Sequence, residues 1–224
     1  MSMLSNLELI RRVPLFSMLN AAQGESVAQA VIKRRFKRGE TIVEQGKKSN
    51  ALFIILTGRA RVFTADARGR EVILANMNPG DYIGEMSLID NEPHSASVRA
   101  EVQTDVLMLG RTDFARCLPE NSSMAYTVMK NLVQRLRSAD RKIESLALMD
   151  VYGRVARSLI EAAHTDDQGR TTIRDKVSRQ DLAKMVGASR EMVSRVMKDL
   201  EDRGYIETML NGSVVIKERL NALG

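Results

Sequence analysis

Residues 178–204 read SRQDLAKMVGASREMVSRVMKDLEDRG, a stretch that predicts two short helices on either side of a glycine turn. Ser178 can cap the first helix by accepting a hydrogen bond from a free backbone amide. Gly187 then interrupts the pattern, and Ser189 caps a second helix that is expected to span 190–203. The stretch therefore predicts a helix-turn-helix.

The second of these helices has two chemically different faces. At about 100° per residue its apolar side chains gather on one side, which is expected to be buried: Val193, Val196, Met197 and Leu200. The opposite side carries Arg190, Glu191, Ser194, Arg195 and Lys198.

The polar face has the chemistry needed to read double-stranded DNA. Arginine offers forked donors to guanine O6 and N7, and a carboxylate accepts from the cytosine amino group. We therefore expect Arg190, Glu191 and Arg195 to read bases in a major groove, and Ser189 and Arg179 to contact phosphates.

A hairpin follows the second helix. The runs 205–208 and 213–216 flank Asn211-Gly212, which is a strong two-residue turn signal. With the helices this predicts a winged helix-turn-helix DNA-binding domain over 150–224. A solvated basic helix in an unrelated α+β domain is the alternative interpretation.

The N-terminal part of the chain reads differently. From 32 to 109, short β-rich runs such as LFIIL at 52–56 alternate with glycine-bearing turns, which is typical of an antiparallel β-barrel or jelly roll. We expect an effector-sensing β-barrel domain over 1–120 and thus an α+β protein. The basic run 33–38 is interpreted as a solvated face before the first strand, with a nucleic-acid patch as the alternative.

Between these domains, residues 121–149 predict a long dimerisation helix. Apolar residues recur at alternating spacings of three and four, the period of a coiled-coil seam: Met129, Leu132, Leu136, Ala139, Ile143 and Leu146. The narrow stripe favours a homodimer. A helix that simply packs on its own barrel is the alternative.

Composition narrows the classes of function. The net charge of +6 favours an anionic partner, and a single cysteine, Cys117, excludes an internal disulfide framework or a multi-cysteine metal cluster within one chain. No run approaches the about 18 apolar residues of a membrane span, so we expect a cytoplasmic protein without a membrane partner. The motifs of common hydrolases, zinc proteases and phosphate loops are absent, and we expect no enzyme and no catalytic or metal-binding residue.

Three motifs carry a resemblance to a known family. They are GDYIGEM at 80–86, DVYGR at 150–154 and VGASREMVSR at 186–195. In order and spacing they resemble the cyclic-AMP receptor protein and fumarate–nitrate regulator (CRP/FNR) superfamily of bacterial transcription regulators. The resemblance implies a cyclic nucleotide-binding-like barrel, a palindromic DNA site with GTGA-type half-sites read by Arg190, Glu191 and Arg195, and contacts with RNA polymerase.

The same resemblance implies an effector pocket, from which this chain departs at two places. Gly84 and Glu85, followed by Met86, match the pair that holds ribose. The phosphate-binding Arg-Ser/Thr-Ala segment reads His94-Ser95-Ala96 here, and Ala139 and Asp140 stand where the family places a Thr-Ser pair for adenine. A neutral histidine cannot form the forked ion pair that an arginine forms with phosphate.

No cofactor is required by these residues, and a small effector is expected. Because the phosphate-binding arginine and the Thr-Ser pair for adenine are both replaced, cyclic AMP is a minority candidate beside cyclic GMP and cyclic di-GMP. The candidate effector-binding residues are Gly84, Glu85, Met86, His94, Ser95, Ala96 and Asp140. A polar loop position is the alternative role for His94. At the level of the whole chain, the alternative is a constitutive regulator whose barrel is a ligand-free scaffold.

Overall fold

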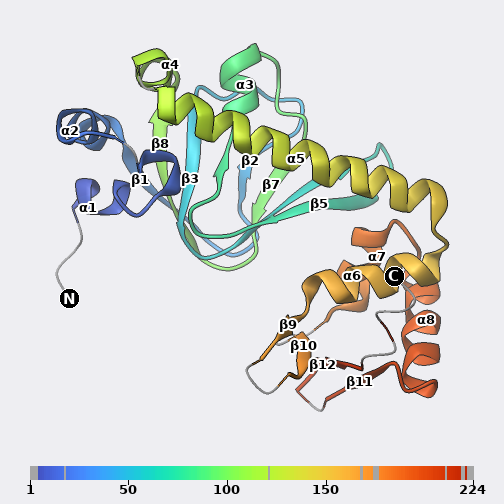
Figure 1. Cartoon of the computed structure of the whole chain (residues 1–224). Coiled ribbons are helices and arrows are strands. Elements are labelled where there is room, and N and C mark those ends of the chain that lie inside the picture. Colours follow the sequence, from blue (N-terminus) through green and yellow to red (C-terminus); the bar gives the residue numbers. More distant parts are fainter. Residues whose placement is uncertain are drawn as a thin grey trace. The chain divides into compact units, whose positions relative to one another are not determined.

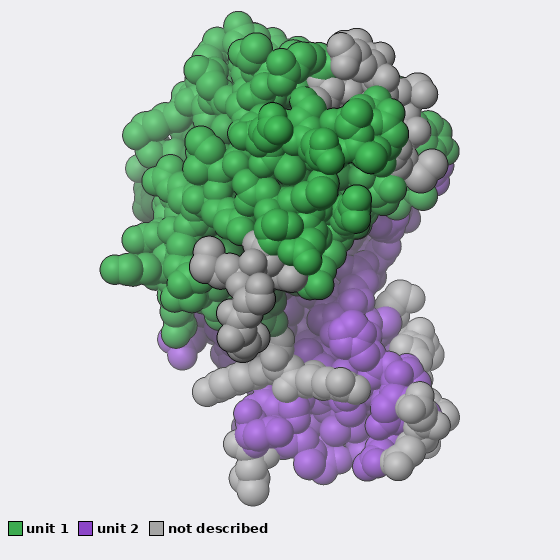
Figure 2. Space-filling model, turned by 90° about the vertical axis from the view of Figure 1, so that its left-hand side faces the viewer, with its two compact units in different colours: residues 1–135 green, residues 136–224 purple. Residues whose placement is uncertain are grey.

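The structure is a computed structural model that describes residues 5–17, 19–120, 122–166, 169–173, 177–209, 211–217 and 220. Nothing is described of the side chains of 117–120 and 122–124. The chain forms two compact units, residues 1–135 and 136–224 (Figures 1 and 2). Within the described residues, no helix combines the length and the apolar character that crossing a bilayer requires.

The first unit is built on eight antiparallel strands. In chain order they are β1 (Ile32–Phe36), β2 (Thr41–Val43), β3 (Ala51–Thr57), β4 (Ala60–Ala65), β5 (Glu71–Met77), β6 (Tyr82–Ile83), β7 (Ser97–Ala100) and β8 (Thr104–Gly110). They form two four-stranded sheets with the orders β1-β8-β3-β6 and β2-β7-β4-β5. This is the expected jelly roll, made of two facing sheets and not of one closed barrel.

Helices cover the outer face of the first sheet (Figure 1). They are α1 (Asn6–Ile10), the short 3₁₀ helix η1 (Pro14–Phe16), α2 (Ala21–Ala30), α4 (Arg111–Glu120) and the first part of α5 (Ser122–Leu148); α3 (Glu85–Asp90) follows β6. Leu52 and Ile54 of β3 pack on this helical layer, whereas Phe53 and Ile55 pack between the sheets. Because β3 is buried on both faces, its sequence is continuously apolar.

Several elements were not expected from the sequence. The first part of the basic run assigned to the region before the first strand lies in strand β1, in which only Phe36 is buried, and Lys37 and Arg38 follow the strand. β1 lies at the edge of its sheet and is defined by its pairing with β8, so its side chains carry no apolar alternation. β6, β7, α2 and α3 were also missed, because each is short or weakly patterned. Helix α4 begins at Arg111, ahead of the expected helical region, and is anchored by buried Phe114.

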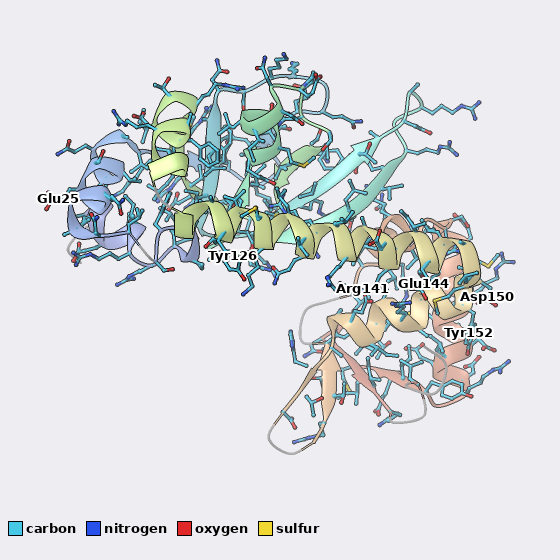
Figure 3. All side chains as sticks on the ribbon, turned by 45° about the horizontal axis from the view of Figure 1, so that its top comes forward. Glu25, Tyr126, Arg141, Glu144, Asp150 and Tyr152 are labelled. Carbon is cyan, nitrogen blue, oxygen red and sulfur yellow. The ribbon has the colours of Figure 1, made fainter. Side chains whose placement is uncertain are left out.

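Helix α5 is amphipathic but incompletely covered. Val128 is buried and Leu132 packs against the first unit's core, as the alternative interpretation required. Leu136, Ile143 and Leu146 are 62%, 65% and 57% exposed in the single chain. Figure 3 shows side chains projecting along this helix from Tyr126 to Glu144. Among the described residues, most of this apolar stripe is therefore exposed.

The second unit holds the expected winged helix-turn-helix. Its elements are α6 (Val151–Ala162), β9 (His164–Thr165), β10 (Thr171–Ile173), α7 (Arg179–Val186), α8 (Arg190–Asp202), β11 (Ile206–Thr208) and β12 (Val214–Ile216). The strands pair in the order β11-β12-β10-β9, and the β11–β12 hairpin is the wing. A separate core, which includes Leu159, Leu182 and Met197, joins the three helices to this small sheet.

Gly58, in the turn between β3 and β4, provides a test of the jelly roll. Its φ is +87°, and an added Cβ would lie 2.8 Å from the Thr104 Cα and closer still to the Gln103 carbonyl oxygen. We predict that Gly58→Ala lowers the free energy of unfolding by about 3 kcal/mol or more, because backbone must move.

The matched control is Gly69→Ala. Gly69 also has a positive φ, +74°, but an added Cβ there would meet nothing within 4 Å. Only the backbone penalty of about 1 kcal/mol is then expected. Equal losses for the two variants in denaturant unfolding would contradict the close approach at Gly58.

Candidate nucleic-acid interface and effector pocket

The two helices of the helix-turn-helix begin at their predicted caps. The Asp181 amide donates to Ser178 Oγ at 3.3 Å, and the Met192 amide donates to Ser189 Oγ at 3.2 Å. Between them Gly187 adopts a left-handed φ of +64°, a conformation that favours glycine. The local sequence therefore positions α8 as expected.

The two faces of α8 are separated as predicted. Val193, Val196, Met197 and Leu200 are buried. The side chains on the opposite face are exposed: Arg190, Glu191, Ser194, Arg195 and Lys198. Ser194 Oγ donates to the Arg190 carbonyl at 2.8 Å, so this hydroxyl retains only its acceptor capacity for an outside partner.

Electrostatics keep Glu191 ready to accept hydrogen bonds. A hydrogen bond from its own backbone amide and another from the Ser189 side chain lower the pKa of Glu191, with smaller contributions from Arg190 and Arg195. The carboxylate is therefore ionised at neutral pH. An ionised carboxylate is the form that accepts from a cytosine amino group.

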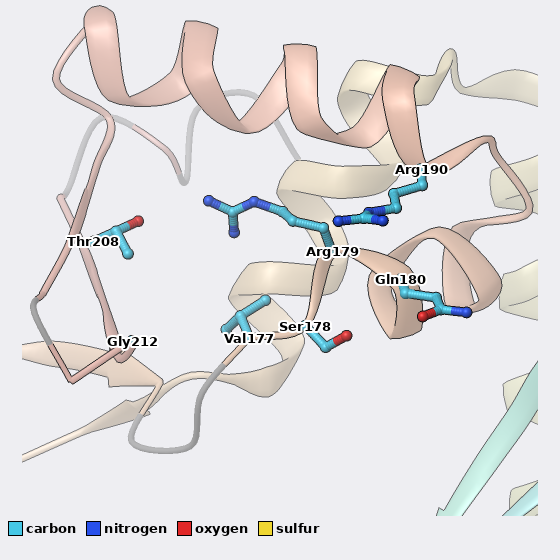
Figure 4. Close-up of a pocket in the computed structure, with 7 residues that line it drawn as sticks. All are labelled: Val177, Ser178, Arg179, Gln180, Arg190, Thr208 and Gly212. Atoms are coloured by element: carbon cyan, nitrogen blue, oxygen red, sulfur yellow. The ribbon is translucent and has the colours of Figure 1, made fainter.

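A groove lies between the helix-turn-helix and the wing. It has a volume of about 450 Å³ and is lined by Val177, Ser178, Arg179, Gln180, Arg190, Thr208 and Gly212. Figure 4 shows Arg179 and Arg190 extending into the same space, with Thr208 and Gly212 on the hairpin side. The structure thus brings a predicted phosphate contact and a predicted base contact together in one concave surface.

Arg154 is a positioning residue to which no role was assigned from the sequence. Its Nε donates to the Val186 carbonyl at 2.9 Å, and its Nη1 donates to the Met149 carbonyl at 3.0 Å. Val186 is the last residue of α7, where carbonyls lack partners within the helix. Arg154 therefore ties the helix-turn-helix to the residue that follows α5. Its motif, DVYGR, was the only signal in the sequence.

A second cavity lies in the first unit beside α3. Its volume is about 190 Å³. It is lined by Val43, Val62, Met77, Ile83, Gly84, Glu85, Met86, Ser87, Asp90, Glu92, Pro93, His94, Ser95, Ala96, Val98 and Arg135. Six of the seven predicted effector-binding residues are in this set. The seventh, Asp140, is exposed on the part of α5 that belongs to the second unit, and its role stays a prediction.

Glu85 is the most deeply buried polar group of this cavity, with 1% of its surface exposed. Its Oε1 accepts a hydrogen bond from Arg135 Nη1 at 2.6 Å, and Arg135 Nη2 donates to the Tyr82 carbonyl at 2.6 Å. The Glu85 Oε2 atom is buried and has no hydrogen-bond partner. Burial raises the pKa of Glu85, and the neighbouring Arg135 opposes that shift.

Arg135 was missed as a pocket residue because the sequence places it on the polar side of a long helix, where most arginines are solvated.

Gly84 has a clear structural reason for its place next to Glu85. Its φ is +95°, and a Cβ there would lie 2.9 Å from the Ala51 carbonyl oxygen. The glycine thus allows α3 to start against β3.

His94 is buried and bonded within the protein. Its Nε2 lies 2.8 Å from Ser49 Oγ, and its backbone amide donates to the Lys47 carbonyl at 2.9 Å. Burial lowers the pKa of His94, so the ring is neutral at pH 7. His94 lines the cavity and also holds the 47–49 loop; its contact with an effector stays a prediction. In the part of the chain that the structure describes, no group of His, Cys, Asp or Glu is arranged to hold a metal ion.

The pKa of His94 predicts how stability depends on pH. A histidine whose pKa is lowered by folding binds fewer protons in the native state than in the unfolded state, whose value is 6.5. Native stability is then lost as the pH falls below that value. We expect His94→Gln to reduce the loss of melting temperature between about pH 7.5 and about pH 5.5.

The control is His164→Gln, because His164 is an exposed residue of the other unit. Thermal unfolding of the three proteins across the same pH range gives the comparison. An unchanged pH profile in the His94→Gln protein would show that burial of this ring has no titration consequence.

Comparisons with known proteins match both parts of the chain. Residues 33–121 match the family described as "Cyclic nucleotide-binding domain", and residues 153–223 match the "Crp-like helix-turn-helix domain". The chain is 35% identical over 193 residues to the "cAMP-activated global transcriptional regulator Vfr" of Pseudomonas aeruginosa, covering 84% of this chain and 90% of that relative. It is 32% identical over 175 residues to the "cAMP-activated global transcriptional regulator CRP" of Salmonella typhimurium, covering 77% and 83%.

Solved structures agree with these matches. The "c-di-GMP Responsive Global Regulator CLP" of Xanthomonas campestris aligns with a TM-score of 0.76 at 25% identity, covering 88% of this chain and 99% of that chain. The "Catabolite Activator Protein" of Thermus thermophilus aligns with a TM-score of 0.54 at 29% identity, covering 94% and 97%. These relatives are similar to the chain across both of its units.

Proposed function

Because the chain belongs to the CRP/FNR superfamily of DNA-binding transcription regulators, we propose that it acts as a homodimer that reads a palindromic site with GTGA-type half-sites under the control of a small effector. Double-stranded DNA, a second copy of the chain and RNA polymerase are its proposed partners. The described residues assign no surface to RNA polymerase.

The exposed polar face of α8 is the observation that carries the proposal. Arg190, Glu191 and Arg195 are exposed while the opposite face of the helix is buried in the second unit's core. Arg190 also lines the groove beside the wing, which Arg179 shares. This arrangement favours Arg190, Glu191 and Arg195 as base contacts, and Arg179 and Ser189 as phosphate contacts. Ser194 and Lys198 flank them on the same face.

The uncovered seam of α5 supports the homodimer. Leu136, Ile143 and Leu146 expose large apolar surfaces in line along one helix. Burial of such surfaces is worth about 25 cal/mol per Å², and a second α5 covers them by coiled-coil packing. Two recognition helices related by a two-fold axis then reach half-sites about 34 Å apart, which is why the target is palindromic.

The ion pair between Glu85 and Arg135 supports control by an effector. Glu85 lines the cavity, and Arg135 belongs to the same helix that carries the seam. A ligand that bonds to Glu85 therefore competes with, or completes, the contacts that hold α5. Cyclic AMP, cyclic GMP and cyclic di-GMP are the proposed effectors. Vfr is named as cAMP-activated and CLP as c-di-GMP responsive.

DNA binding by substituted proteins tests the base contacts. We expect Arg190→Ala and Arg195→Ala each to weaken binding to a GTGA-type palindrome by about 1 to 3 kcal/mol and to relax specificity at one base pair. Arg179→Ala is expected to weaken binding to all sequences alike. Arg170→Ala, an exposed arginine in the β9–β10 turn, is the control and is expected to change little.

Fluorescence anisotropy with the palindrome and single-base variants gives these affinities. An equal loss on every duplex for both α8 variants would show that these arginines contact only the DNA backbone.

The oligomeric state tests the seam. We expect Ile143→Glu to convert the dimer to a monomer at micromolar concentration, because it places a carboxylate in an apolar interface. Arg137→Glu changes charge on the same helix at an exposed position outside the stripe and is expected to leave the dimer intact. Sedimentation equilibrium distinguishes the two. A dimeric Ile143→Glu protein would mean that the seam is not the dimer interface.

A further inference from the structure

Helix α8 carries one apolar side chain that the core of the second unit does not cover. Met192 is 37% exposed, whereas the other apolar residues of the helix are at most 7% exposed. The structure describes all of Arg190–Asp202, and within this range Met192 is the one exposed apolar residue. More than a third of this side chain is therefore left for a partner outside the chain.

Met192 lies beside the side chains that are proposed to read bases. It is the third residue of α8, and its amide donates to Ser189 Oγ at 3.2 Å, which fixes it in the first turn. Arg195 Nη2 donates to Met192 Sδ at 3.8 Å, so the thioether and this guanidinium lie side by side. In a helix-turn-helix, the N-terminal residues of the recognition helix contact the base edges. Met192 therefore belongs to the turn of α8 that enters the groove in the proposed complex.

The polar neighbours of Met192 leave one feature of a base pair without a reader. Arg190 and Arg195 match the acceptors of guanine, and Glu191 matches the amino group of cytosine. Thymine presents a 5-methyl group in the major groove, and an apolar side chain is the kind of contact that recognises it. A GTGA half-site contains one thymine in each strand. Met192 is the side chain of α8 with the chemistry to read that methyl group.

The surroundings of Met192 favour DNA over an apolar protein surface. Its exposed neighbours in α8 are polar or charged, namely Arg190, Glu191, Ser194 and Arg195. An apolar partner that covered Met192 would also remove these charges from water without giving them partners, which is costly. A duplex offers guanine acceptors and phosphates to the same arginines. The mixture of one apolar group and several charges therefore fits the edge of a base pair.

We infer that Met192 reads the 5-methyl group of a thymine in the half-site, next to the guanine that Arg195 reads. The methionine side chain is unbranched and polarisable, so it adapts its shape to the edge of a base. Burying one methyl-sized group corresponds to about a fourfold gain in affinity. This inference rests on the proposed function, because it adds a base contact to the same face of α8.

Deoxyuridine gives the direct test, because it differs from thymidine only in lacking the 5-methyl group. The two thymines of one GTGA half-site in the palindrome are replaced by deoxyuridine one at a time, and binding to the full-length protein is measured by fluorescence anisotropy. Titrations are run without nucleotide and with cyclic AMP, cyclic GMP or cyclic di-GMP, and the condition of tightest binding is kept for all duplexes. We expect one of the two exchanges to weaken binding about fourfold.

Substitution of Met192 shows whether this side chain is responsible. Met192→Ala removes the contact, and we expect it to bind the thymine and deoxyuridine duplexes within about 1.5-fold of each other. Met192→Leu keeps an apolar side chain of similar volume and is expected to retain at least about a twofold preference for thymine.

The matched control is Met185→Ala. Met185 lies in α7, is 36% exposed and does not line the groove beside the wing. Removing it takes away a methionine with the same exposure as Met192 but outside the recognition helix. We expect the Met185→Ala protein to keep the full preference for thymine over deoxyuridine.

Two results would overturn the inference. The first is a wild-type protein that binds both deoxyuridine duplexes as tightly as the thymine duplex. The second is a preference for thymine that persists in Met192→Ala, because the methyl group is then read by another side chain or through the shape of the DNA.

The variants at Arg190 and Arg195 separate this failure from failure of the proposed function. A protein whose specificity for the palindrome falls in Arg190→Ala and Arg195→Ala, but which does not distinguish deoxyuridine from thymidine, loses only the contact by Met192. A protein that does not bind the GTGA-type palindrome specifically overturns the proposed function and this inference together.

Discussion

The ion pair between Glu85 and Arg135 joins the cavity of the first unit to helix α5. The two residues are fifty positions apart in the sequence, yet Oε1 and Nη1 lie 2.6 Å from each other. Glu85 is the first residue of α3, beside the cavity, and Arg135 lies in the long helix α5. Buried ion pairs add little net stability, because desolvation offsets their attraction. What this pair contributes is geometry, because it holds the middle of α5 beside α3.

Helix α5 connects three roles through its own side chains. Its first turns pack on the jelly roll through Val128, its middle bears Arg135, and its later turns expose the apolar seam. Past its end, Arg154 bonds to the Met149 carbonyl and to the last carbonyl of α7. Backbone carbonyls at helix ends lack partners within the helix, so an arginine that satisfies them fixes one element against another. Arg154 thus fixes the end of α7 against the residue that follows α5.

The two candidate sites have opposite electrostatic character. Four of the predicted DNA contacts are cationic. Arg190, Arg195 and Lys198 lie on the exposed face of α8, and Arg179 and Arg190 line the groove. The cavity of the jelly roll instead gathers carboxylates around one paired guanidinium. The net charge of +6 describes neither site. The charge of the whole chain therefore does not predict the charge of either site.

Local chemistry was sufficient for the DNA-binding unit. The caps at Ser178 and Ser189, the left-handed Gly187 and the burial of one face of α8 all follow from patterns within a few residues, so the sequence by itself determined them. The seam of α5 and the pocket motif at Gly84 were also visible, because each is a contiguous or periodic signal.

Only the tertiary structure decided the rest. β1 is a strand because β8 pairs with it. Arg135 and Arg154 donate hydrogen bonds to oxygens far away in the sequence, because folding places those oxygens opposite them. An arginine on a helix looks the same in the sequence whether its partner is water or a carboxylate fifty residues away, since that choice is made by long-range packing and not by its neighbours.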